Sequence, residues 1–153
     1  MNLTSMIFNR EQKQTKTKLC FGFVPFVITK NEIEVLLVRS RHGFWGTPKG
    51  GWKKSDKDGL STAFREFQEE TGLLYDKTHE NVKHVFLNDG INFEYKVNNV
   101  QKKSTLFPML LKSKPKNVEF SYDANETCAH LWCKCEDMVN FFAFTEDREM
   151  AKV

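Results

Sequence analysis

A chain of 153 residues is long enough to bury one hydrophobic core and too short for two domains of ordinary size. Its 40% hydrophobic and 28% charged residues exclude a disordered or fibrous protein, and no apolar run approaches the roughly 20 residues that span a bilayer. The net charge of +3 suits anionic ligands, but it does not by itself indicate a nucleic-acid-binding stripe.

The start of the chain is polar and basic. We therefore expect a flexible tail over residues 1–18 and a single folded domain over residues 19–153. Residues 19–29 and 33–38 have the composition of β-strands joined by a turn at Lys30-Asn31, and Pro25 places the first strand at a sheet edge or a bulge.

A helix is predicted between Asp58, a suitable N-cap, and Gly72, a suitable C-terminal stop. At about 100° per residue, its apolar residues form one stripe, which comprises Leu60, Ala63, Phe64 and Phe67. This stripe is expected to face the core.

Three acids, Glu66, Glu69 and Glu70, share a different face of the predicted helix. Like charges at this spacing repel one another, so a positive partner is expected. Arg65 can reach Glu69 at i+4, and a hard divalent cation such as Mg²⁺ is the more informative candidate. The alternative is an ordinary solvated helix face.

Further strands are predicted at residues 82–87, 91–97, 104–111 and 129–135, with a polar loop over residues 98–103. Helices are predicted at residues 136–142 and 145–152. Strands, one helix, strands and then helices indicate a mixed sheet between helical layers.

The four cysteines, at positions 20, 128, 133 and 135, lack the paired spacing of a zinc site. No signal-peptide core is present, so we expect reduced thiols and a cytoplasmic location, with a nuclear location or a mitochondrial presequence as alternatives. Cys133, Cys135 and His130 would form an alternative metal site, but alternation along a strand explains their spacing more simply.

A glycine-rich loop, WGTPKGGW at residues 45–52, precedes the helix, which contains the run REFQEETGL at residues 65–73. Together they resemble the signature of the Nudix hydrolases, Gly-x5-Glu-x7-Arg-Glu-(apolar)-x-Glu-Glu-x-Gly-(apolar). Counting from Gly51 places Lys57 at the first Glu position, whereas counting from Gly50 places Asp56 there. We favour the second count, because it keeps an acid and puts the extra residue in a loop.

The resemblance implies an α/β fold, a Nudix-like α/β/α sandwich with a mixed β-sheet. It implies metal-dependent hydrolysis of a phosphoanhydride bond by in-line attack of water, with Mg²⁺ or Mn²⁺ as cofactor. The implied catalytic residues are Arg65, Glu66, Glu69 and Glu70, and the implied metal-binding residues are Gly50, Glu66, Glu69, Glu70 and Glu126. Glu66 or Glu70 is expected to accept the proton of the attacking water.

Trp45, the turn Pro48-Lys49-Gly50 and the spacing Glu126-x5-Trp132 look like those of the asymmetrical dinucleoside tetraphosphate hydrolases. Diadenosine tetraphosphate is therefore the expected substrate of a monomeric enzyme that has no membrane partner. The expected substrate-binding residues are Arg39, Arg41, Trp45, Lys49, Tyr95, Lys103 and Phe107. We further expect Trp45, Tyr95 and Phe107 to cluster near the metal site.

Three alternatives stay open at this point. A diphosphoinositol polyphosphate phosphohydrolase of the same family also uses a Pro-Lys-Gly-Gly turn, and capped RNA is a third kind of substrate. From another class, the chain would be a catalytically silent Nudix module that senses a nucleotide; Lys57 favours this idea, whereas the intact acids of the helix argue against it.

Overall fold

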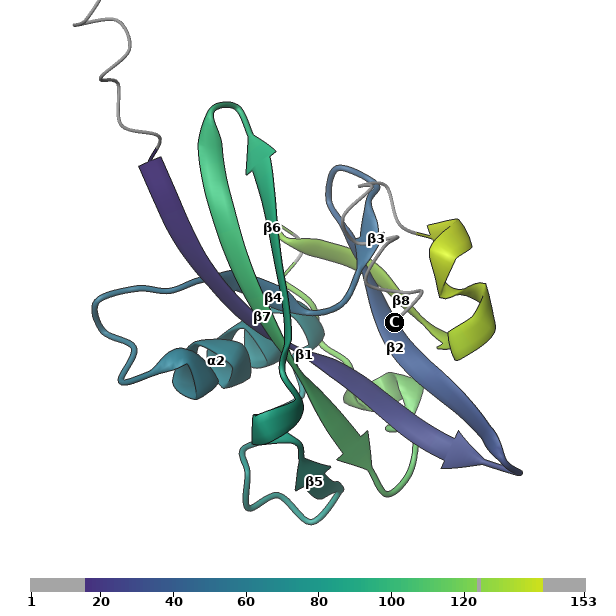
Figure 1. Cartoon of the computed structure of the whole chain (residues 1–153). Helices are drawn as coiled ribbons and strands as arrows, with labels where there is room; N and C mark the ends of the chain where they lie inside the picture. The colour runs from purple at the N-terminus through teal and green to yellow at the C-terminus, as the bar shows by residue number, and fades with distance from the viewer. Residues whose placement is uncertain (1–15, 124, 142–153) are drawn as a thin grey trace, which may run out of the picture.

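The computed structural model describes residues 16–123 and 125–141, and these residues form a mixed β-sheet with a helix packed against it (Figure 1). The strands are β1 (Lys16–Thr29), β2 (Glu32–Ser40), β3 (Trp45–Gly46), β4 (Lys49–Gly51), β5 (Val82–Val85), β6 (Ile91–Val97), β7 (Val100–Leu111) and β8 (Thr127–Lys134). The helix is α2 (Gly59–Thr71), and three 3-10 helices are η1 (Leu87–Asp89), η2 (Asn117–Glu119) and η3 (Cys135–Phe141).

The strand order is β3-β2-β1-β7-β5, while β4 pairs with β1, β6 with β7, and β8 with β2. The long central strands β1 and β7 run parallel, and their neighbours are antiparallel. The predicted α/β sandwich with a mixed sheet is therefore confirmed. The predicted helix 136–142 is found as the 3-10 helix η3, whereas the predicted helix 145–152 and residues 1–15 of the predicted tail lie outside the described residues.

Local sequence accounts for both ends of α2. The Asp58 side chain accepts a hydrogen bond from the Ser61 main-chain N–H (2.8 Å), as an N-cap does. Gly72 follows the helix with φ 74°, a left-handed conformation that glycine adopts without steric cost. Both predicted caps are confirmed, so the register of the helix and its acids is determined locally.

The sheet buries apolar side chains on both faces. The core under α2 includes Phe23, Leu36, Ala63 and Phe67, all fully buried, and Leu60 and Phe64 pack against it. The other face buries Val35, Leu37, Leu106, Cys133 and Met138, the last of these from η3. Leu36 and Leu37 thus belong to different cores, as expected for successive residues of a strand. The predicted apolar stripe of the helix is confirmed.

Two hairpins turn on pairs of residues with positive φ. Lys30 and Asn31 form the predicted turn, with φ values of 47° and 68°. Asn98 and Asn99 form a second one, with φ values of 50° and 64°. The predicted loop at 98–103 is therefore wrong, because this two-residue turn lets β7 begin at Val100.

The first strand also differs from its prediction. β1 begins at Lys16, three residues before the predicted start at residue 19, because it pairs with the extended end of β7. It is a central strand and not an edge strand. Pro25 fits there because β4 pairs with β1 only up to Gly22, and β2 pairs with it only from Phe26 onward. None of the helices among the described residues is long and apolar enough to cross a membrane.

Candidate active site

Three carboxylates from distant parts of the chain converge at one end of α2. Glu66 and Glu69 lie one helical turn apart, and Glu126 precedes β8. One carboxylate oxygen of each residue lies within 4.8 Å of the others. The pKa of Glu66 is raised by its burial and then by the charge of Glu69. Carboxylate oxygens that converge in this way, one of them buried, suit a hard divalent cation.

Glu70 belongs to the same helix but points to the glycine-rich loop. Its Oε2 accepts a hydrogen bond from the Lys49 main-chain N–H (2.9 Å). Burial, followed by the nearby charge of Glu66, raises the pKa of Glu70 well above its usual value. The structure therefore places Glu70 beside the carboxylate cluster and ties it to β4.

Arg65 is the positive partner that the acidic helix face requires. Its Nε and Nη2 bind the two carboxylate oxygens of Asp56 (both 3.0 Å), and Nη1 binds Glu66 (2.9 Å) and Glu69 (3.3 Å). Nη2 also donates to the Gly51 carbonyl (2.8 Å). The bidentate contact holds the pKa of Asp56 well below its usual range. One guanidinium thus joins the loop to two acids of the cluster.

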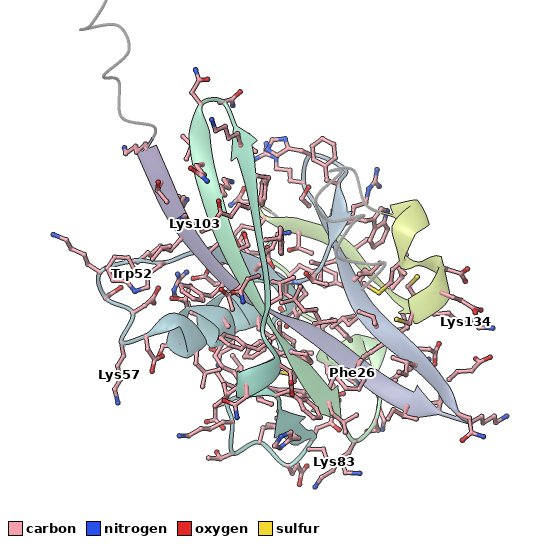
Figure 2. The ribbon with its side chains drawn as sticks, in the orientation of Figure 1. Phe26, Trp52, Lys57, Lys83, Lys103 and Lys134 are labelled. Carbon is pink, nitrogen blue, oxygen red and sulfur yellow. The ribbon has the colours of Figure 1, made fainter. Side chains whose placement is uncertain are left out.

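The loop also shows how the family pattern fits this chain. Asp56, whose side chain is only 6% exposed, contacts Arg65, whereas Lys57 is exposed to solvent (Figure 2). This geometry agrees with the count from Gly50, which keeps an acid at the first Glu position.

Because Lys57 contacts neither Arg65 nor the cluster, Lys57→Glu is expected to leave kcat within a few fold of wild type, as surface substitutions usually do. Steady-state kinetics with an excess of Mg²⁺ would measure this. A gain of more than about tenfold would instead assign the first Glu position to residue 57 and show that the native enzyme is impaired.

Glycine is required at position 50 by a close approach. A Cβ at Gly50 would collide with the carboxylate of Glu66. The main chain of β4 therefore lies directly against an acid of the cluster, next to the predicted Gly50 carbonyl ligand.

A cavity of about 170 Å³ opens beside Glu70 and brings together three of the predicted substrate-binding residues: Trp45, Lys49 and Tyr95. Tyr95 also stacks with Phe93, with ring centroids 5.8 Å apart, and the Lys49 Nζ lies 5.1 Å from the Phe93 centroid. An aromatic, cationic pocket thus adjoins the carboxylates.

Two other predicted residues lie elsewhere. We call the side of β6 and β7 that carries Tyr95 the cavity face, and the side that carries Phe107 the helix face. Phe107 packs against Phe23 in the core under α2, and the Lys103 Nζ lies 3.8 Å from Glu94 on the helix face. Tyr95 pairs with Lys102 of β7, so the even-numbered residues of β7 share its face, whereas Phe107 points to the opposite face. The expected clustering of Phe107 with Tyr95 is therefore wrong.

Arg39 and Arg41 are exposed at the end of β2 and in the following turn, and neither lines the cavity. Two residues that do belong to this region were missed. Phe44 lines the cavity, and Lys102 pairs with Tyr95 on the cavity face, with its Nζ 5.9 Å from the Tyr95 ring centroid. The Asn98-Asn99 pair, a suitable two-residue turn, was the signal that would have put Lys102 opposite Tyr95.

A larger cleft, of about 390 Å³, lies between the segment after α2 and the segment after β7, where Tyr75, His79 and Lys112 line it. It shares no residue with the carboxylate cluster. Size alone does not identify an active site, and the converging acids favour the smaller cavity.

Comparison with known proteins agrees with this geometry. The NUDIX domain family matches residues 22–152. The fold is similar to that of a C. elegans Ap4A hydrolase in a binary complex, with TM-score 0.72 and 22% identity over 88% of this chain and 93% of that chain. It is also similar to the NUDIX domain of Shewanella oneidensis NrtR complexed with ADP ribose, with TM-score 0.66 and 14% identity over 99% of this chain and 96% of that chain.

At these identities the structural likenesses show the fold and leave the substrate open. Among curated proteins, no sequence matches the chain. The family match covers most of the chain, and it includes the glycine-rich loop, α2 and β8, from which the carboxylate cluster is built. The chain belongs to the Nudix family.

Proposed function

We propose that this Nudix pyrophosphohydrolase splits a phosphoanhydride bond of a dinucleoside polyphosphate such as diadenosine tetraphosphate. The observation that carries the proposal is the aromatic cavity of Trp45 and Tyr95, which Glu70 and Lys49 also line. A base in this cavity would leave its phosphates at the carboxylates. The C. elegans Ap4A hydrolase, whose fold is similar, makes this substrate class the first to test.

Mg²⁺, or Mn²⁺ in its place, is the proposed cofactor. Glu66, Glu69 and Glu126 would hold it, with the Gly50 carbonyl and Glu70 at the inner side of the site. When bound, such an ion neutralises phosphate oxygens and lowers the pKa of a coordinated water.

The protein's own groups then have separate tasks. Arg65 holds Glu66 and Glu69 in place through its Nη1. The oxygen of the attacking water bonds to phosphorus as the bridging P–O bond breaks, and the bridging oxygen leaves with the departing nucleotide. A carboxylate oxygen of Glu66 or Glu70 accepts the proton of that water. Burial raises the pKa of both carboxyl groups, which makes each a stronger base than an exposed glutamate.

A diphosphoinositol polyphosphate phosphohydrolase is the main alternative. An inositol polyphosphate has no aromatic face, so it would gain nothing from the Phe44, Trp45 and Tyr95 rings around the cavity. A nucleobase stacked on such rings gains about 1–3 kcal/mol. The cavity therefore favours the nucleotide. The intact carboxylate cluster argues against a silent sensor module.

Tyr95→Ala is expected to lower kcat/KM for diadenosine tetraphosphate roughly 5- to 150-fold, because it removes the stacking platform. Hydrolysis of an inositol pyrophosphate, where present, should be spared. Tyr95→Phe, which keeps the ring, is the matched control and should stay near wild type. Steady-state kinetics on both substrates measures these effects.

Two outcomes would count against this assignment. An equal loss on both substrates would indicate that Tyr95 acts through folding. Efficient turnover of the inositol compound alone would show that the enzyme is a diphosphoinositol polyphosphate phosphohydrolase.

A further inference from the structure

The cavity is too small to hold a whole dinucleoside polyphosphate. Cavities that enclose a drug-sized ligand measure roughly 300–1,000 Å³, whereas this one measures about 170 Å³. It can enclose one base and leaves the rest of the substrate on the surface. Tyr95 lines the cavity and lies on the hairpin of β6 and β7, so the surface of this hairpin is where the rest of the substrate would continue.

Strand pairing sets the residues next to Tyr95 in a row. Tyr95 on β6 pairs with Lys102 on β7, and Lys102 pairs with Lys18 on β1. The N-terminal end of β1 runs beside the β6–β7 hairpin (Figure 1). Paired residues of neighbouring strands point to the same face at a spacing of about 4.8 Å. Lys18 and Lys102 therefore lie on the cavity face.

The two faces of these strand ends differ in charge. On the cavity face, residues 16–20, 93–97 and 100–104 contribute three charged side chains, and all three are lysines: Lys16, Lys18 and Lys102. On the helix face, Lys103 is paired with Glu94. Among the described residues, no acid forms an ion pair with Lys18 or Lys102. Positive charge that is not offset on one face attracts an anion.

Lys18 also reaches the glycine-rich loop. The end of its side chain lies against Gly51, so closely that a Cβ at Gly51 would collide with it. The neighbouring residue, Gly50, lies against Glu66 of the carboxylate cluster. Because successive residues of a strand point to opposite faces, the Lys18 ammonium group and Glu66 lie on opposite sides of β4, with the narrow main chain of two glycines between them. Lys18 therefore belongs with Lys102 and Tyr95 on the cavity face.

We propose that Lys18 and Lys102 form a second anion-binding site on the cavity face, which holds the part of the substrate's phosphate chain that extends beyond the cavity. This site selects substrates with long phosphate chains over those with a diphosphate link. The inference rests on the proposed function and adds a residue of β1, Lys18, to substrate recognition.

The test compares diadenosine tetraphosphate with ADP-ribose, whose diphosphate link is too short to use the second site. Lys18→Ala is expected to raise KM for diadenosine tetraphosphate about 5- to 10-fold at low salt, with kcat unchanged and ADP-ribose hydrolysis altered less than about twofold. The effect should shrink as ionic strength rises, because exposed charges are screened. Lys83→Ala, at a distant exposed lysine, is the matched control and should change nothing (Figure 2).

A second variant displaces the ammonium group without removing its charge. Gly51→Ala places a methyl group where the end of Lys18 now lies, so it should raise KM for diadenosine tetraphosphate in the same direction as Lys18→Ala. The proposal is overturned if neither variant changes KM for diadenosine tetraphosphate, or if both substrates lose equally.

A binding measurement separates this proposal from the proposed function. Calorimetric titration with inorganic tripolyphosphate requires no turnover, and Lys18→Ala should weaken its binding about 5- to 10-fold relative to wild type and Lys83→Ala. Weakened tripolyphosphate binding without hydrolysis of any dinucleotide would support the anion site and reject the proposed substrate. Unchanged tripolyphosphate binding would reject the anion site, whatever the enzyme hydrolyses.

Discussion

Replacing Glu66 with glutamine is expected to lower kcat at least about 100-fold, because it withdraws a negative ligand from the carboxylate cluster while keeping the side-chain shape. Glu66 contacts Arg65, lies against Gly50 and forms the cluster with Glu69 and Glu126, so it has more roles in the site than its neighbours. Steady-state kinetics over a range of Mg²⁺ concentrations measures the loss.

The same variant should fold normally. Burial, and then the charge of Glu69, raises the pKa of Glu66. A neutral side chain removes both unfavourable effects, so the free energy of unfolding without metal should stay the same or rise. Glu80→Gln, at an exposed acid outside the cluster, is the control and should keep full activity. A fully active Glu66→Gln enzyme, or wild-type turnover in an excess of chelator, would contradict the expectation that the acids of α2 bind a catalytic metal ion.

Asp56→Asn is expected to lower the free energy of unfolding by about 2–3 kcal/mol at pH 7, somewhat less than the full cost of breaking a buried ion pair because Arg65 is partly exposed. Asp56 accepts hydrogen bonds from Arg65, the Lys53 main chain and the Thr62 hydroxyl. An amide nitrogen cannot accept any of them. We also expect kcat to fall about tenfold, because Arg65 then holds Glu66 less firmly.

The pH dependence of stability tests whether this loss comes from the ion pair between Asp56 and Arg65. The folded pKa of Asp56 is lowered, so its stabilising contribution is complete above the unfolded pKa of about 4. The contribution is lost as pH falls from about 5 towards the folded pKa, so the difference between wild type and Asp56→Asn should narrow in acid. Urea unfolding at pH 7 and at pH 3 measures this difference.

The N-cap of α2 offers the matched control for this prediction. Asp58→Asn also removes one carboxylate beside the helix, but asparagine caps a helix as well as aspartate does, so stability should change little. If Asp56→Asn lost no more stability than Asp58→Asn, the contact between Asp56 and Arg65 would contribute little to the fold.

The sequence alone determined α2 and much of its chemistry. The cap at Asp58, the stop at Gly72 and the separate apolar and acidic faces follow from local rules of helix geometry. Since residues three and four apart share one helix face, the contact between Arg65 and Glu69 was predictable as well. The family motif spans the same continuous stretch, which is why the sequence alone shows a resemblance to the Nudix hydrolases.

Tertiary structure decided everything that depends on pairing between distant segments. Glu126 meets Glu66 only because β8 pairs with β2, and no local rule specifies that pairing. Glu70 points to the Lys49 main chain, because β4 lies beside the helix.

The cavity face shows this dependence on strand pairing most clearly. A loop at residues 98–103 leaves the face of each β7 residue undetermined, and the family resemblance implies Lys103 as a substrate-binding residue. The observed turn at Asn98-Asn99 pairs Lys102 with Tyr95 and places Lys103 on the opposite face. Side chains alternate along a strand, so a shift of one residue moves a charge from the cavity face to the helix face of the sheet.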